Sequence, residues 1–165
     1  MYSLLVSLAS AMFIIERFIP YPVPGGKWGF SNFIVLFAAV NLGIGPAIII
    51  GSLKSIIGSI FTGLIFTPTF FMGFLGVIAA AIVEGLFSKT KFLGYTGLSF
   101  LGMISNNIVQ LYVGALLIKS TAIFSFLPIM LSLGAISAFA NAYLAKKMEE
   151  VLNENNFSFK FTKKN

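Results

Sequence analysis

The chain of 165 residues carries too little charge to cover the surface of a soluble domain. Hydrophobic residues make up 58% of it, charged residues make up 10%, and the mean hydropathy is +0.96. Soluble domains carry about 25% charged residues, so this composition predicts an integral membrane protein. A basic edge facing anionic lipid accounts for the net charge of +6 without a nucleic-acid partner.

The residues that most catalytic and metal sites require are absent. The sequence contains no Cys, His or Asp, and its five acidic residues are all Glu. Ser-His-Asp and Cys-His catalysis, His-based metal sites and paired-Asp magnesium sites are therefore excluded. We expect no enzyme activity, no metal and no cofactor.

Six apolar segments predict an all-α bundle of six transmembrane helices, because a membrane helix needs roughly 20 mostly apolar residues. The expected spans are 1–19, 28–42, 47–66, 70–87, 95–118 and 122–144. They form one transmembrane domain over 1–145, followed by a short basic tail over 146–165. The first span has no positive region before it and is expected to be retained rather than cleaved.

The distribution of Lys and Arg predicts the orientation in the cell membrane. With six spans, one side carries seven of these residues and the other side carries three, with Lys54 inside a span and left out. The side with seven includes both termini, which are therefore expected in the cytoplasm.

Polar side chains inside the spans are candidate ligand contacts, since ionisable groups in a bilayer usually face a cavity or a partner. Lys54 lies well inside the third span. Asn106, Asn107 and Gln110 crowd the fifth span, and Asn106 and Gln110 share one helix face. Hydrogen-bonding between helices is the alternative for these amides, and snorkelling to the headgroups is the alternative for Lys54.

The connection after the first span is the most informative stretch. Three prolines stiffen it, and its glycines let the backbone approach closely. It presents Lys27 and Asn32, either as a cradle for a ligand arriving from outside or as a structured outer loop.

Other residues receive simpler interpretations. Ser3, Ser7 and Ala11 form a ridge of small residues, which suits close helix packing inside the protein or docking of a separate membrane subunit. Glu84 is expected to form an ion pair at the membrane interface with Lys89 or Lys91. Four other residues are expected to anchor or cap helix ends: Glu16, Arg17, Asn41 and Asn141.

The run 24–32, Pro-Gly-Gly-Lys-Trp-Gly-Phe-Ser-Asn, resembles the Pro-Gly-x-Lys-x-Gly-x-x-Asn signature of the Gx transporter family. That family is often labelled "heptaprenyl diphosphate synthase component I" and is similar to the substrate-binding (S) components of energy-coupling factor transporters. Asn106-Asn107-Ile-Val-Gln110 resembles the family's His-Asn-x-x-Gln, with Asn106 in place of His. Lys54 takes the place of the family's Arg. The resemblance extends over about residues 8–118.

The resemblance implies a six-helix S component whose first helix docks, through Ser3, Ser7 and Ala11, onto a transmembrane coupling subunit driven by two cytoplasmic ATPases. It implies a small-molecule substrate in an outward-facing cavity closed by the first loop. Two lysines and several amides suit an anionic or carbonyl-rich molecule.

Two other functions compete with transport. One is a non-catalytic membrane accessory subunit of isoprenoid, quinone or redox machinery, in which the polar residues only join helices. The other is an autonomous ion or proton carrier. Only Glu84 could relay protons within a span, so the sequence supports this last function least.

Overall fold

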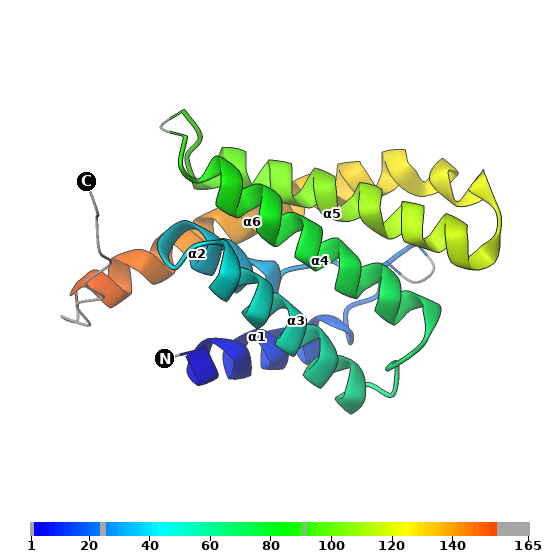
Figure 1. Ribbon diagram of the computed structural model, residues 1–165, viewed down its shortest axis with the longest axis horizontal. Helices are drawn as coiled ribbons and strands as arrows, with labels where there is room; N and C mark the ends of the chain where they lie inside the picture. The colour runs from blue at the N-terminus through cyan, green and yellow to red at the C-terminus, as the bar shows by residue number, and fades with distance from the viewer. Residues whose placement is uncertain (1, 24–25, 91, 155–165) are drawn as a thin grey trace.

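The computed structural model describes residues 2–23, 26–90 and 92–154, and helices account for most of them (Figure 1). No strand occurs among these residues. The elements are α1 (Tyr2–Glu16), α2 (Asn32–Asn41), α3 (Ile44–Phe61), α4 (Pro68–Phe87), α5 (Tyr95–Ile118), the 3₁₀-helix η1 (Thr121–Phe126) and α6 (Leu127–Glu154).

Four of these helical segments are long and apolar enough to cross a membrane. They are α3, α4, α5 and the continuous segment of η1 with α6. Many large apolar side chains on their outer faces are exposed, as they are on α1, which suits contact with lipid. The predicted all-helical membrane protein is therefore confirmed at this level.

The second predicted span is wrong in length and surroundings. α2 has 10 residues, which makes it about 15 Å long and too short to cross a hydrocarbon core of about 30 Å. It contacts all five other α-helices, and its residues from Phe33 to Ala39 are buried. Its apolar sequence serves the protein core instead of lipid.

Other boundaries also differ from the prediction. The third helix starts at Ile44 and not at residue 47, so that Pro46 lies in its first turn, where proline is tolerated because the first N–H groups of a helix have no partner within it. α1 has 15 residues and falls short of a full span. α6 continues to Glu154, so part of the predicted tail is helix, and residues 155–165 lie outside the described part of the chain.

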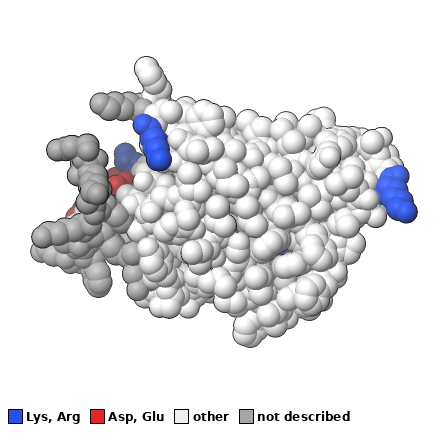
Figure 2. All heavy atoms as spheres, viewed as in Figure 1, with Lys and Arg blue, Asp and Glu red and all other residues white. Residues whose placement is uncertain are grey.

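The helices run so that the connections alternate between two ends of the bundle. Figure 1 shows the start of α1, the α4–α5 turn and the end of α6 at one end, and the α3–α4 and α5–η1 turns at the other. Charged side chains lie at these two ends of the face in Figure 2, and the broad surface between them is almost entirely uncharged. This pattern is typical of a bundle with an apolar belt in a membrane.

Candidate functional site

A buried network of polar groups fixes the first loop, residues 17–31, to helices α1 and α3. The Glu16 carboxylate accepts hydrogen bonds from the Ser31 backbone N–H at 3.1 Å and the Ser31 hydroxyl at 3.2 Å. The Lys54 ammonium donates to the Ser31 hydroxyl oxygen at 3.0 Å and to Asn32 Oδ1 at 2.6 Å. Glu16, Ser31 and Lys54 are all buried, so the network joins the end of α1, the start of α2 and the middle of α3.

Aromatic side chains pack against one another in the described parts of the loop, residues 17–23 and 26–31. The Trp28 indole N–H donates to the Pro20 carbonyl at 3.0 Å, and the Trp28 ring stacks on Phe30 and meets Tyr21 edge-on. Gly29 has a φ of +78°, a conformation that favours glycine. Its carbonyl accepts a hydrogen bond from Asn141 Nδ2 on α6 at 3.0 Å, which fastens the loop to the far side of the bundle.

The Lys27 ammonium lies under this loop, 4.1 Å from the centre of the Phe13 ring of α1, in a cation–π contact. Burial lowers the pKa of Lys27 from 10.5 to about 8, and the nearby Glu16 carboxylate offsets only part of this effect. Gly73 on α4 faces the lysine, and a Cβ there would lie 3.5 Å from Nζ, an ordinary van der Waals distance.

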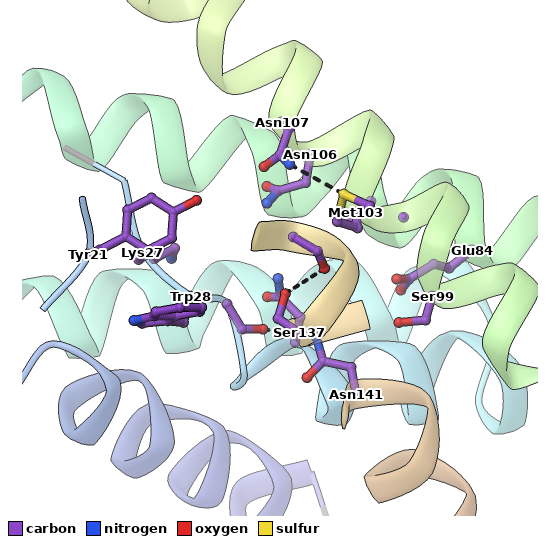
Figure 3. A pocket seen from close by; sticks show the side chains of 15 residues that line it. Tyr21, Lys27, Trp28, Glu84, Ser99, Met103, Asn106, Asn107, Ser137 and Asn141 are labelled. Atoms are coloured by element: carbon purple, nitrogen blue, oxygen red, sulfur yellow. Dashed lines mark hydrogen bonds between the residues drawn. The ribbon is translucent and has the colours of Figure 1, made fainter. Parts of the chain in front are cut away.

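A polar cavity lies beneath the loop, between α4, α5 and α6 (Figure 3). The space open to the centre of a water molecule is about 20 Å³, enough for a water or two and too small for a metabolite. The lining side chains and glycines are Tyr21, Lys27, Trp28, Gly29, Asn32, Ala80, Glu84, Ser99, Gly102, Met103, Asn106, Asn107, Gly134, Ser137 and Asn141. Figure 3 shows Glu84 and Ser99 at one end of the cavity and Tyr21, Lys27 and Trp28 at the other.

Glycines on the facing helices make room for the polar side chains. A Cβ on Gly102 of α5 would overlap the Glu84 carboxylate, and one on Gly76 of α4 would overlap the Asn106 amide. A Cβ on Gly134 of α6 would lie 2.7 Å from the Met103 sulfur. These helices approach one another as closely as they do only because the positions are glycine.

The cavity brings together four of the predicted ligand residues: Lys27, Asn32, Asn106 and Asn107. Lys54 does not line it, and its ammonium binds Ser31 and Asn32 instead. Gln110 is buried against Gly76 and is not among the lining residues. The two lysines thus differ: the Lys54 ammonium is bound within the loop network, whereas Lys27 lines the cavity with its ammonium over the Phe13 ring.

Glu84 lies at a different place from the one predicted. It was expected at the membrane interface beside Lys89, but it is 3% exposed and lines the cavity. Among the described residues its Oε2 atom has no hydrogen-bond partner. A signal existed in the sequence, since Gly76, Ala80 and Glu84 recur every four residues and share one helix face.

Glu16 and Asn141 also do more than anchor or cap a helix end. Glu16 holds Ser31, and Asn141 reaches across to the loop at Gly29. The spacing of Gly134, Ser137 and Asn141 places them on one face of α6, and this face lines the cavity. Asn41 donates to the Phe37 carbonyl one turn back, as predicted, and also to the Tyr95 hydroxyl at 2.7 Å.

The small-residue ridge of α1 faces outward. Ser3, Ser7 and Ala11 are all exposed, while the opposite face, including Leu5, Ala9 and Phe13, packs into the bundle. The ridge therefore makes no close helix packing within the described chain.

A family model described as "Heptaprenyl diphosphate synthase component I" matches residues 5–148. Comparison with curated proteins and with solved structures gives no match.

Proposed function

The chain belongs to the heptaprenyl diphosphate synthase component I family, and we propose that it is a substrate-binding subunit of an energy-coupling factor-type transporter. It captures a small metabolite from outside the cell, and separate ATPase subunits drive the uptake. The observation that carries this proposal is the polar cavity beneath the first loop. Buried polar groups inside an apolar bundle are costly and usually mark a functional site.

The outward-facing ridge of α1 supports a membrane partner. Small residues let a second helix approach closely, and Ser3, Ser7 and Ala11 are free of contacts that would block it. The proposed partner is a transmembrane coupling subunit, which joins this chain to two cytoplasmic ATPase subunits.

The proposed orientation follows from the lysines. Lys89 in the α4–α5 turn and Lys146 and Lys147 near the end of α6 lie at the end of the bundle where α1 begins. An excess of positive charge is typical of the cytoplasmic side of a membrane protein, which supports a cytoplasmic location for this end. The first loop and the cavity then open toward the outside.

We propose no catalytic activity for this chain, because it contains no Asp, His or Cys. A non-catalytic accessory subunit of isoprenoid, quinone or redox machinery is the second candidate. It is favoured by the family description and by the small open volume of about 20 Å³.

Co-expression with candidate coupling and ATPase subunits tests the transport proposal. We expect a stable complex after purification and a small molecule retained by the binding subunit in native mass spectrometry. A chain that associates with none of these subunits and retains no small molecule would contradict it.

The ridge gives a matched pair of variants for this experiment. Ser7→Phe places a bulky ring on the ridge, and Ser132→Phe places the same ring on the exposed face of α6. We expect Ser7→Phe to reduce complex recovery at least about tenfold, a loss of roughly 1.4 kcal/mol, and Ser132→Phe to leave it unchanged. Equal recovery of the complex with both variants would show that the ridge is not the docking surface.

A further inference from the structure

The hydroxyl groups of the cavity offer lone pairs and no hydrogen to a ligand. Ser99 donates its hydroxyl hydrogen to the Ala138 carbonyl at 2.8 Å, and Ser137 donates to the Gly134 carbonyl at 2.9 Å. A hydroxyl has one hydrogen and two lone pairs. Both oxygens therefore remain available as acceptors only.

Two of the amides also direct N–H groups toward protein atoms, as the hydroxyl groups do. Asn107 Nδ2 donates to the Met130 carbonyl at 3.1 Å and to the Met103 sulfur at 3.3 Å, which uses both of its hydrogens. Asn141 Nδ2 donates to Gly29, and its buried Oδ1 atom has no partner among the described residues. Both amide oxygens are left for a ligand, and so is the second hydrogen of Asn141 Nδ2.

Glu84 adds the only carboxylate that lines the cavity. It is buried, Oε2 lacks a partner within the described chain, and Figure 3 shows the carboxylate directed into the cavity beside the Ser99 hydroxyl. A buried carboxylate without a partner is costly, and a ligand that supplies positive charge and N–H donors would remove that cost.

The wall also carries donors. The Trp28 N–H binds the Pro20 carbonyl, whereas donor groups remain on Lys27, Tyr21, Asn32 and Asn106. Lys27 and Tyr21 lie at the opposite end of the cavity from Glu84 (Figure 3). Acceptors nonetheless dominate the end of the cavity that holds Glu84.

We propose that this cavity binds a small molecule through a positively charged N–H group, such as an ammonium or amidinium, held by Glu84 with Ser99, Ser137 and Asn141. The inference rests on the proposed substrate-binding function and names its ligand class. The open volume of about 20 Å³ admits a group about as large as a water molecule, such as an ammonium. A larger ligand requires the covering loop or the helices to move apart.

Three probes of nearly the same shape test the inference. Acetamidinium is positively charged, acetamide is neutral and acetate is negatively charged. The full chain in lipid nanodiscs is heated with each probe at equal ionic strength and pH 7. We expect acetamidinium to raise the apparent Tm by at least about 2 °C more than either other probe. Glu84→Gln abolishes this preference, whereas Glu150→Gln, on the exposed surface of α6, keeps it.

Three results would overturn the inference: acetate stabilising most, the same preference in Glu84→Gln, or stabilisation by Na⁺ that Glu84→Gln removes while acetamidinium has no effect. If Glu84→Gln does not fold, Ser137→Ala replaces it and is expected to reduce the acetamidinium shift. The proposed transport function fails separately, on the absence of any coupling complex and of any retained molecule. A retained native molecule without a positive N–H group would overturn the ligand class alone.

Discussion

The two halves of the bundle each bury a charged side chain, and they treat it in opposite ways. In the half formed by α1, α2 and α3, Lys54 is fully buried and donates to Ser31 and Asn32, with Glu16 accepting from Ser31. In the half formed by α4, α5 and α6, Glu84 is equally buried but has an oxygen without a partner in the described chain. Burial alone thus does not separate a structural charge from an available one, whereas the hydrogen-bond partners do.

The largest effect on stability is expected when Lys54 is replaced, because its buried charge is hydrogen-bonded within the protein. Lys54→Met removes the hydrogen bonds to Ser31 and Asn32 and one of the cations near Glu16. Breaking a buried charge network in this way costs about 3–5 kcal/mol. We expect a large drop in apparent Tm in detergent, measured against Lys119→Met, which changes an exposed lysine. A drop no larger than that of the control would mean that the network does not hold the loop.

The next effect tests the space that holds Glu84. Gly102→Ala would place a Cβ against the Glu84 carboxylate and cost about 1–3 kcal/mol through overpacking. Gly94→Ala, at the start of the same helix, meets nothing within 4 Å and is the matched control. We expect a lower apparent Tm for Gly102→Ala than for Gly94→Ala in thermal unfolding. Equal apparent Tm values would show that α4 and α5 are not closely packed at Glu84.

A smaller effect is expected at the end of the bundle where α6 extends beyond the apolar belt. The Tyr95 hydroxyl accepts from Asn41 at 2.7 Å and donates to Glu149 at 2.9 Å, joining α2, α5 and α6. Tyr95→Phe removes both hydrogen bonds and should cost about 1 kcal/mol. The variant should also lower hydrogen-exchange protection at the start of α5, and Tyr143→Phe, at an exposed position, should not.

The smallest effect on stability is expected at Glu84 itself. Glu84→Gln keeps the shape of the side chain and removes a buried carboxylate that lacks a partner for Oε2 within the described chain, so the free energy of unfolding should stay the same or rise. Together with a large loss for Lys54→Met, this outcome would show that Lys54 is structural and that Glu84 is available to a ligand. A loss as large as that of Lys54→Met would instead assign Glu84 to the structural network.

Part of the site was accessible from the sequence because polar residues stand out in apolar segments. Lys54, Asn106 and Asn107 were identified in this way, and all three are buried as expected of functional or structural polar groups. The role of each was not accessible, since it depends on residues far away in the chain: Lys54 meets Ser31, and Asn107 meets Met130. The sequence predicts Glu84 at the interface because Lys89 and Lys91 are its nearest lysines along the chain.

The sequence by itself determined that the chain is a helical membrane protein. Hydropathy, and the prolines, glycines and polar residues that end apolar segments, are local properties of the sequence. It predicted α5 with the correct bounds, Tyr95–Ile118, because the polar stretch 88–91 precedes this apolar segment and Lys119 follows it. Tertiary structure alone decided that α2 is a short helix in the core, because an apolar segment is the same whether protein or lipid surrounds it. It also decided which buried polar atoms are paired, because the partners come from different helices and meet only when the bundle closes.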